Sequence, residues 1–385
     1  MTTSLTSKRH ELIVMRPAWA DIDLGALHHN LKTIRTQAGK KRVLAILKAN
    51  AYGHGLSRIA QELQDIDAIG VARVDEALQL RNAGVTQPIV LLEGFFEAKQ
   101  IPVLAASNIQ PVLHTKHQVN QLLQADNLPQ AMRVWIKVDT GMHRLGLNLE
   151  DVERVYTQLK GSRNVVGEPV IMSHFACADE PAHPQNQVQL ARYAQAVKVL
   201  PESVTSMANS AALFASLAPD YDWVRPGLSL YGISPFPGGV GRELALQPVM
   251  NLQASLISIR KINQGESVGY GAAWTAPHDT WIGIVAIGYG DGYPRHAPQG
   301  TPVWINGKEY PLVGRVAMDM ITVELGPHMS AQLGDTAQLW GPDLAVERVA
   351  ETVGTIPYEL LCNVARRVNL HYIDGHDVSG LGEVS

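Results

Sequence analysis

A lysine ends an apolar run near the start of the chain. In LAILKANAYGHG (44–55), small apolar residues lead directly to Lys48, and Tyr52 and a Gly-His-Gly turn follow it. Lysine is among the side chains least often buried in proteins, so a lysine at the end of an apolar run requires an explanation. A partly desolvated lysine has a lowered pKa and offers a nucleophilic amine, which bonding to a carbonyl group requires. The alternative is a lysine that extends from a strand end to solvent.

Polar residues also end seven later apolar runs of the sequence. The runs are short, rich in Val and Ile and without clean alternation, as expected of parallel strands covered on both faces. With the first, they span 43–50, 68–73, 88–94, 109–114, 134–141, 168–176, 204–210 and 222–227. The polar residues at their ends are Lys48, Arg73, Glu93, His114, Lys137 with Asp139, His174, Asn209 with Ser210, and Arg225. A ring of such residues indicates a site, because a purely structural protein has no need of one.

Amphipathic segments separate these runs. In 56–66, apolar residues recur at helical spacing, and 74–84 has two acidic residues in its first turn and Gly84 at its end. Segments 149–161 and 187–200 repeat the pattern. The alternation predicts a (β/α)8 TIM barrel, with the active site at the C-terminal ends of the strands. A doubly wound open sheet is less compatible, because no GxGxxG motif follows the first run.

The pattern changes after about residue 245. Alternating segments lie close together there, separated by Gly, Pro, Asn and Asp, which predicts a mostly antiparallel β-domain. The Gly- and Pro-rich stretch 235–248 indicates the boundary between the two domains. The predicted domains are therefore a barrel at 12–244 and a β-domain at 245–385.

The loops after the seventh and eighth runs predict a phosphate-binding site. Asn209 and Ser210 follow the seventh run, and RPGLSLYG (225–232) follows the eighth. In (β/α)8 barrels, small side chains and backbone N–H groups of these loops often bind phosphate. Together with Lys48 on the first strand, they predict pyridoxal 5′-phosphate (PLP) as the cofactor. Ser210 can equally be the N-cap of the following helix, and both roles are compatible.

The overall composition excludes several classes of function. With a formal net charge of −4, the chain has no basic surplus for a nucleic-acid or anionic-membrane partner. Its two cysteines, Cys177 and Cys362, form neither a disulfide framework nor a zinc pattern. The histidines show no HExxH motif, so no metal site is predicted. No apolar stretch reaches the length of a secretory signal core or a membrane span, so a cytoplasmic protein is expected.

Ten sequence motifs resemble those of one enzyme family. Matching them all in order is far more specific than matching any one. They are AWADIDLGALHHN, VLAILKANAYGHG, IKVDTGMHRLG, SHFACADE, MANSAA, VRPGLSLYG, VGYGAAW, IGYGDGYPR, GRVAMDM and PYELLC. Over nearly its whole length, the chain thereby resembles the bacterial alanine racemases, which are PLP enzymes with an N-terminal barrel and a C-terminal β-domain.

The resemblance implies a set of cofactor-binding residues. Lys48 would bond covalently to PLP, and Arg225 would face the pyridine nitrogen. His174 would link Arg225 to the second catalytic base. The remaining residues implied at the cofactor are Tyr52, Ser210 and Tyr358 at the phosphate, Arg144 at the phenolic oxygen, and Asn209 and Gly227 in the closing loops.

The resemblance also implies how the reaction is catalysed. Lys48 and Tyr270 would be the two acid/base groups, one on each face of the substrate. Lys137 matches a lysine that is often carbamylated in relatives and would then orient Arg144. The residues implied at the substrate are Arg144, Met318 and Asp319. In the family, the β-domain residues come from the other subunit, so a homodimer with shared active sites is expected.

The implied function is the interconversion of L-alanine and D-alanine, which supplies D-alanine for peptidoglycan. Three alternatives are a broad-specificity amino acid racemase, a PLP-dependent decarboxylase of the same fold and a non-catalytic PLP carrier. A decarboxylase usually pairs the pyridine nitrogen with a carboxylate, so Arg225 argues against it. A carrier resembles the barrel alone, so the β-domain with Tyr270 argues against that alternative.

Overall fold

The chain forms two compact units. The computed structural model describes residues 17–375 except 201–202 and 218–219. The barrel unit comprises Asn30–Leu230 and Pro235–Pro237. The C-terminal unit comprises the segment up to His29, Tyr231–Ser234 and the chain from Gly238 on.

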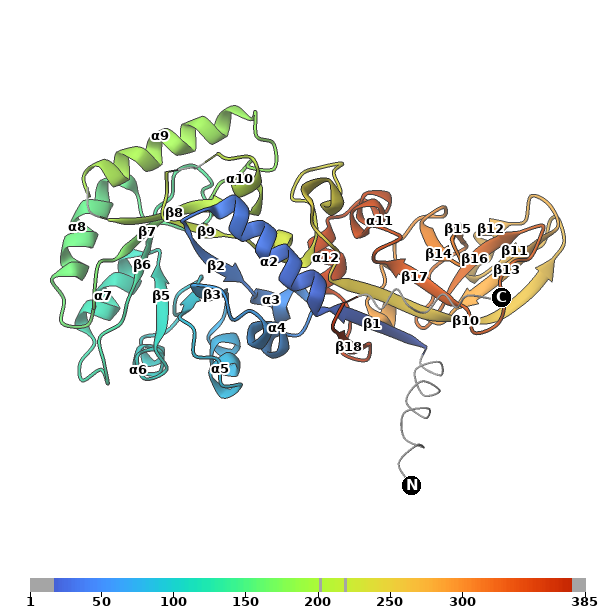
Figure 1. Ribbon diagram of the computed structural model, residues 1–385, viewed down its shortest axis with the longest axis horizontal. Coiled ribbons are helices and arrows are strands. Elements are labelled where there is room, and N and C mark those ends of the chain that lie inside the picture. Colours follow the sequence, from blue (N-terminus) through green and yellow to red (C-terminus); the bar gives the residue numbers. More distant parts are fainter. Residues whose placement is uncertain (1–16, 201–202, 218–219, 376–385) are drawn as a thin grey trace, which may run out of the picture. The chain divides into compact units, whose positions relative to one another are not determined.

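Eight parallel strands close into the barrel, where each strand pairs with the next along the chain and the last pairs with the first. They are β2 (Arg42–Ile46), β3 (Ala68–Val71), β4 (Ile89–Leu91), β5 (Ile109–Leu113), β6 (Trp135–Lys137), β7 (Val170–Met172), β8 (Val204–Asn209) and β9 (Trp223–Arg225). Each overlaps one predicted run, so the predicted (β/α)8 TIM barrel is confirmed (Figure 1). Strands β3 and β4 are buried along their whole length, which explains why their sequences show no polar alternation.

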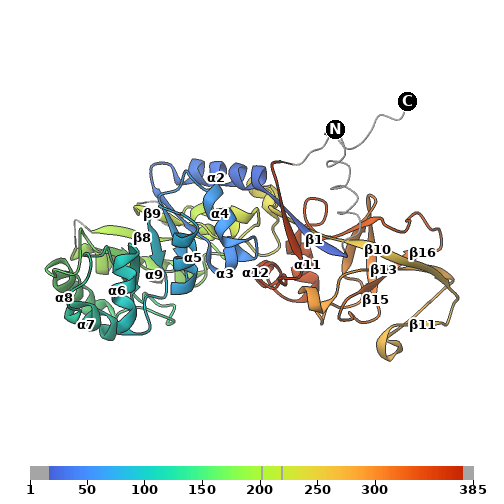
Figure 2. The same cartoon turned by 90° about the horizontal axis from the view of Figure 1, so that it is seen from below.

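Helices alternate with the barrel strands along the chain. They are α2 (Leu24–Ala38), α3 (Lys48–Tyr52), α4 (Leu56–Glu62), α5 (Val74–Asn82), α6 (Ile101–Ala106), α7 (Lys116–Gln124), α8 (Leu149–Lys160), α9 (Pro184–Lys198) and α10 (Ser210–Phe214), with the 3-10 turn η1 (Ala98–Gln100). Helices α5 to α9 lie outside the ring of strands (Figures 1 and 2). In α8, Val152, Val155 and Leu159 are buried at helical spacing, as an amphipathic helix on a barrel requires.

A sheet of eight strands dominates the C-terminal unit. Its strands are β1 (Ala18–Asp23), β10 (Met250–Ile262), β13 (Thr280–Val285), β14 (Pro302–Ile305), β15 (Lys308–Val313), β16 (Ile321–Gly326), β17 (Thr336–Trp340) and β18 (Asn369–Ile373). Their order is β13-β16-β15-β14-β17-β10-β1-β18, and β10 also pairs with β13. Every pairing in this sheet except β1–β18 is antiparallel, so the predicted mostly antiparallel β-domain is confirmed. Strands β11 (Ser267–Val268) and β12 (Trp274–Thr275) form a separate hairpin.

Strand β1 belongs to the C-terminal unit, whereas the sequence-based division placed 12–244 in the barrel and 245–385 in the β-domain. Ala20 lies opposite Leu252 of β10 on one side and Leu370 of β18 on the other. All of β1 except Asp21 is buried, so the strand needs a partner along both edges. A closed barrel has no free edge to offer.

Short helices complete the C-terminal unit. They are α11 (Val346–Val353) and α12 (Pro357–Cys362), with the 3-10 turns η3 (Gly241–Leu244), η4 (Tyr270–Ala272) and η5 (Tyr289–Asp291). The 3-10 turn η2 (Leu228–Tyr231) belongs to the barrel unit except for Tyr231. None of the helices in the described ranges combines the length and the apolar character that crossing a membrane requires. Within the same residues, no three side chains of His, Cys, Asp or Glu are grouped so as to hold a metal ion.

Candidate active site

Lys48 follows strand β2 and opens an unusual turn. The four residues from Ala49 to Tyr52 all have left-handed backbone angles, with φ of 54, 56, 53 and 51°. This conformation costs an L-residue roughly 1–2 kcal/mol, so α3 is a strained left-handed turn rather than an ordinary helix. The side chain of Lys48 is exposed at the start of this turn. Strain of this kind is concentrated at functional sites, where surrounding contacts enforce it.

The buried histidine His54 helps to hold the left-handed turn. Within the turn, Ala51 N donates to Leu47 O at 2.8 Å. The His54 Nδ1 atom lies 3.0 Å from the carbonyl oxygen of Ala51 and 2.9 Å from that of Tyr52. Burial lowers the pKa of His54 to about 4, although both backbone hydrogen bonds act in the opposite direction. The imidazole is therefore neutral at physiological pH and donates its Nδ1 proton to these carbonyls.

Acid is expected to destabilise the barrel through His54. Its pKa is about 4 in the folded chain, against 6.5 for the ordinary side chain, so the folded state is at full stability above pH 6.5. As the pH falls from 6.5 towards 4, only the unfolded chain binds a proton at His54. The free energy of unfolding therefore falls by about 3 kcal/mol. Thermal unfolding from pH 7 to pH 4.5 should show a shallower decline for His54→Gln than for the wild type. The exposed His117→Gln is the control, and equal slopes for all three proteins would contradict this assignment.

The loops after β8 and β9 converge on the hydroxyl of Ser210. Its Oγ accepts hydrogen bonds from the N–H groups of Gly227 (3.0 Å) and Ser229 (3.4 Å), and it lies 3.0 Å from the Ser229 hydroxyl. The N-cap of α10 is Asn209, whose Oδ1 accepts a hydrogen bond from Ala212 N at 2.9 Å. The cap role considered for Ser210 is therefore wrong, because the preceding residue fills it. Ser210 is the first residue of the helix.

Tyr52 adjoins this group through Gly227. A Cβ atom at position 227 would lie 2.7 Å from the Tyr52 hydroxyl, so the tyrosine reaches this place only because glycine has no side chain. We name Tyr52, Ser210, Gly227 and Ser229 the hydroxyl cluster. Hydroxyls and backbone N–H groups are the donors that a phosphate group accepts hydrogen bonds from. The cluster therefore fits the phosphate of PLP.

Arg225 is a buried cation at the end of β9. Its Nη1 donates to Ser206 Oγ at 2.7 Å, and its Nη2 donates to Ser173 O at 2.6 Å and to Met207 O at 3.1 Å. Burial lowers the pKa of Arg225 to about 10, so the guanidinium is still protonated at neutral pH. Within the described residues its Nε makes no hydrogen bond, which leaves that donor for a ligand atom.

His174 is neutral beside this arginine. Its Nδ1 lies 3.1 Å from Arg225 Nη2, which makes Nδ1 the acceptor and places the ring proton on Nε2. Burial, followed by the positive charges of Arg225 and Lys137, holds the pKa of His174 well below its usual range. Arg225 and His174 are therefore in direct contact, which is the first half of the link to the second base that the resemblance implies.

Lys137 is buried at the end of β6, only 8% exposed. Burial, and then the charges of Arg144, Arg225 and Lys48, lower the pKa of Lys137 to about 8. The carboxylate of Asp139 raises the pKa of Lys137 and is the one acidic group among those that shift it. The mouth of the barrel thus has an excess of positive charge, which suits an anionic cofactor and substrate.

Arg144 is exposed in a loop whose two ends are joined. Leu147 N donates to Lys137 O at 2.8 Å, and Asp139 N donates to Leu147 O at 3.0 Å. The Asp139 carboxylate also accepts a hydrogen bond from His143 N at 3.1 Å. This closed loop presents Arg144 near the end of β6 although its side chain is not buried.

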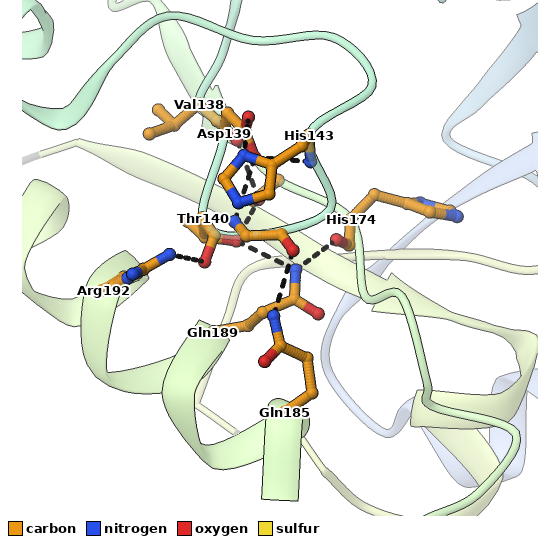
Figure 3. A network of polar contacts seen from close by, with 10 residues as sticks. Val138, Asp139, Thr140, His143, His174, Gln185, Gln189 and Arg192 are labelled. Carbon is orange, nitrogen blue, oxygen red and sulfur yellow. Dashed lines mark hydrogen bonds and ion pairs between the residues drawn. The ribbon is translucent and has the colours of Figure 1, made fainter. Parts of the chain in front are cut away.

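Helix α9 braces the loops that carry these residues (Figure 3). The completely buried Gln189 donates from Nε2 to the Thr140 hydroxyl at 3.2 Å and to the His174 carbonyl at 2.8 Å. Gln185 donates to the Gly141 carbonyl at 3.0 Å. The loops after β6 and β7 are therefore fixed to one helix, which holds Arg144 and His174 in a constant relation.

Four predicted site residues lie in the C-terminal unit with exposed side chains. They are Tyr270, 69% exposed, Met318, 53% exposed, Tyr358, 37% exposed, and Asp319. Arg367 holds the loop around two of them, because it pairs with Asp319 at 2.8 Å and with Asp291 at 2.7 Å. Exposed apolar side chains held on an ordered loop are typical of an interaction surface.

The predicted site residues thus fall into two sets. The set at the C-terminal ends of the barrel strands is Lys48, Tyr52, Lys137, Arg144, His174, Asn209, Ser210, Arg225 and Gly227. The set in the C-terminal unit is Tyr270, Met318, Asp319 and Tyr358. Sequence reasoning missed Ser173 and Ser206, which bind Arg225, and Gln189, which braces the loops. Ser173 and Ser206 lie inside the predicted apolar runs 168–176 and 204–210, so their positions on the strands could have indicated them. Gln189 lies in a predicted helix, where nothing in the sequence distinguishes it from other polar residues.

By its fold and by the position of its site, the chain is a (β/α)8-barrel enzyme with an additional β-unit. Two family models match most of its length. The alanine racemase N-terminal domain matches residues 22–235, and the alanine racemase C-terminal domain matches residues 249–372. The chain therefore belongs to the alanine racemase family and is an isomerase, as the sequence motifs predict.

Known relatives and solved structures agree with this family. The alanine racemase of Aeromonas hydrophila subsp. hydrophila is 50% identical over 359 residues, which cover 93% of this chain and 100% of that protein. The biosynthetic alanine racemase of Pseudomonas aeruginosa superposes with a TM-score of 0.89 at 41% identity, over 93% of this chain and 100% of that one. The alanine racemase of Bartonella henselae, solved with covalently bound pyridoxal phosphate, has a TM-score of 0.84 at 32% identity, over 93% and 100% of the two chains.

Proposed function

We propose that the chain interconverts L-alanine and D-alanine with PLP bonded to Lys48. The observation that carries the proposal is the common position of Lys48, Arg225 and the hydroxyl cluster at the strand ends of one barrel. They would hold the aldehyde carbon, the ring nitrogen and the phosphate of the cofactor. When bound, PLP accepts electron density from the substrate and makes its α-proton acidic.

Two residues are proposed to move the proton, one on each face of the substrate's α-carbon. Lys48 serves one face through its Nζ, and Tyr270 serves the other through its hydroxyl. An ordinary tyrosine has a pKa of about 10, so it needs help to act as a base near neutrality. His174 accepts a hydrogen bond from Arg225 and therefore has its proton on Nε2. Donation of that proton's hydrogen bond to Tyr270 would favour the phenolate.

Arg225 is proposed to control the ring nitrogen. Because it stays protonated at neutral pH, it does not give up a proton to that nitrogen. An unprotonated ring accepts electrons less strongly, which limits side reactions during proton transfer. This property favours a racemase over a decarboxylase.

Arg144 and two residues of the C-terminal unit are proposed to bind the substrate. The guanidinium of Arg144 would pair with the carboxylate of alanine. Met318 and Asp319 would line the pocket, with Asp319 held by Arg367. Side chains that narrow the pocket there would favour alanine by excluding larger substrates.

Lys137 is proposed to be carbamylated. With its pKa lowered to about 8 by burial and neighbouring cations, a substantial fraction of its amine is neutral and nucleophilic. That amine can add to carbon dioxide, forming an N–C bond and releasing one proton. The resulting carbamate would be an anion near Arg144, able to orient its guanidinium.

The proposed activity is tested by α-proton exchange. Protein loaded with PLP should convert either enantiomer of alanine to the racemate and incorporate solvent deuterium at the α-carbon. A PLP carrier would show no exchange. Faster release of carbon dioxide from lysine or ornithine would identify a decarboxylase, and equal turnover of larger amino acids would identify a broad-specificity racemase.

The active sites are proposed to be shared between two subunits of a homodimer. Tyr270 and Met318 are exposed on the C-terminal unit, as residues that complete a partner's site would be. Lys48→Ala and Tyr270→Ala proteins should each be inactive alone. After unfolding and refolding together, hybrid dimers have one intact site, so about one quarter of wild-type activity should return. No recovery, in a mixture shown to contain hybrids, would mean that each site is built within one chain.

Gly227→Ala is expected to weaken cofactor binding. The new Cβ would lie 2.7 Å from the Tyr52 hydroxyl and push it out of the hydroxyl cluster. Overpacking of this size costs about 1–3 kcal/mol, which corresponds to a loss of PLP affinity of about five-fold to 100-fold. Titration of the PLP-free protein with PLP measures this loss. Gly161→Ala is the control, because its Cβ would meet no atom closer than 3.4 Å, and equal affinities for both variants would contradict the placement of the phosphate.

The proposed cellular role is the supply of D-alanine for peptidoglycan, in the cytoplasm. Both follow from the family to which the chain belongs and from the activity proposed here. The supply of D-alanine is tested by expressing this chain in a bacterium that requires D-alanine. Such cells should then grow without added D-alanine.

A further inference from the structure

The carboxylate of Glu76 bridges two parts of the barrel unit. Its Oε1 accepts a hydrogen bond from the backbone N–H of Ala49 at 2.7 Å. Its Oε2 accepts hydrogen bonds from Ala72 N at 2.9 Å and from Arg73 N at 3.1 Å. Glu76 lies in the first turn of α5, so the same side chain closes the start of that helix and grips the residue after Lys48.

The contact with Ala49 is made at the start of the left-handed turn. Ala49 has a φ of 54° and is the first of four consecutive residues in this costly conformation. Bonds within the turn and from His54 engage carbonyl groups of the turn, including that of Ala49, which accepts from Gly53 N at 3.1 Å, but none of them engages the Ala49 N–H. From outside the turn, Glu76 holds the peptide N–H that follows Lys48, and on the preceding side Leu47 N donates to Gly70 O at 2.9 Å.

We infer that Glu76 is a positioning residue for Lys48. It acts through the peptide N–H of Ala49 and has no contact with the reacting atoms. A hydrogen bond to a carboxylate is about twice as strong as one between neutral groups, so it can hold a strained backbone in place. This inference rests on the proposal that Lys48 carries the cofactor.

The physical reason lies in the reach of the lysine. Its amine stands at the end of a flexible four-carbon chain, so its position depends on a fixed main chain. A misplacement of about 1 Å can reduce the rate of a positioned reaction about 100-fold. Loosening the turn should therefore reduce proton transfer while the binding of substrate, which depends on other residues, changes little.

The test compares two helix caps of the same barrel. Glu76→Ala removes the bridge, and Thr115→Ala removes the N-cap of α7, where Thr115 Oγ1 accepts a hydrogen bond from Gln118 N at 3.1 Å. Both should lower the melting temperature, because both helices lose a cap. Only Glu76→Ala should speed amide hydrogen exchange in residues 47–53 of the PLP-free protein. In the PLP-loaded protein, only Glu76→Ala should reduce kcat, by about ten-fold to 100-fold, with KM within about three-fold.

Glu76→Asp, whose carboxylate is one methylene shorter and cannot reach both sets of N–H groups, replaces Glu76→Ala if that protein folds poorly. Glu76→Gln is the conservative control. Its one carbonyl oxygen can serve Ala49 N, so exchange and kcat should recover most of the way to wild type. Unchanged exchange and kcat in Glu76→Ala, or in Glu76→Asp where it takes its place, would overturn the inference and leave Glu76 as a helix cap only. Borohydride reduction and peptide mapping of the wild type separate the two proposals. A pyridoxyl label away from Lys48 refutes the proposed function, whereas a label at Lys48 with normal Glu76 variants refutes only the positioning role.

Discussion

Lys48→Ala protein should bind PLP without its characteristic visible absorbance and should be inactive in both directions. The substitution removes the covalent attachment of the cofactor and one of the two proton-transfer groups. We expect kcat to fall by at least about 10⁴-fold, since general acid–base catalysis alone supplies up to about that factor. Absorbance spectra and racemisation assays from each enantiomer measure the effect.

Two further variants distinguish the covalent role of Lys48 from an effect of its positive charge. Lys48→Arg keeps the positive charge but cannot bond to the aldehyde, so it should be as inactive as Lys48→Ala. Lys198→Ala removes an exposed lysine of α9 and should keep both colour and activity. The assignment of Lys48 as the cofactor lysine would be refuted if the Lys48→Ala protein stayed active. It would also have to carry the pyridoxyl label on another lysine after borohydride reduction.

Tyr270→Phe should keep the colour of the bound cofactor and lose catalysis on one face. The ring remains, but the group that would accept and return the proton is gone. Exchange of the α-proton from one enantiomer should fall by about 10²–10⁴-fold, and exchange from the other should fall much less. Washout of the α-proton into deuterated water, measured separately for L-alanine and D-alanine, shows the asymmetry.

The control for this variant is Tyr221→Phe. Tyr221 precedes β9, at the end of the barrel strands away from Lys48, and packs edge-on against Tyr193. It should exchange both enantiomers at the wild-type rate. Equal loss for the two enantiomers in Tyr270→Phe would contradict the two-base mechanism and would indicate a general defect of the site.

The barrel and its half of the site can be predicted from the sequence because each leaves a local pattern. A parallel strand buried on both faces is a short apolar run, and the polar residue that breaks the run lies at the mouth. Lys48, His174 and Arg225 are found in this way. The contact between His174 and Arg225, at 3.1 Å, follows from strand ends that share one face.

The left-handed turn cannot be predicted in the same way. Positive φ is typical of glycine and, less often, of asparagine, yet two alanines and a tyrosine adopt it beside Asn50. Contacts from residues distant in sequence, such as that of Glu76, override the local preference. A propensity-based reading of LKANAYG therefore has no means of finding the turn that presents the lysine.

The position of β1 escapes sequence analysis for a related reason. AWADID forms a buried strand, but its sequence pattern does not say which sheet accepts it. Its partners β10 and β18 come from far along the chain.

The N-cap of α10 could not be assigned from the sequence either. Both Asn209 and Ser210 are residue types that often cap helices, and only the backbone conformation decides that Asn209 is the cap.

The pairing of β1 with β10 and β18 has a consequence for synthesis on the ribosome. Strand β1 is translated before any barrel strand, yet both of its partners, β10 and β18, are translated after the whole barrel. The barrel can close as soon as β9 has emerged, because all its strands lie between Arg42 and Arg225. While the barrel strands are being translated, the nascent polypeptide therefore carries an apolar strand without its sheet partners, which is a target for chaperones that bind unfolded segments.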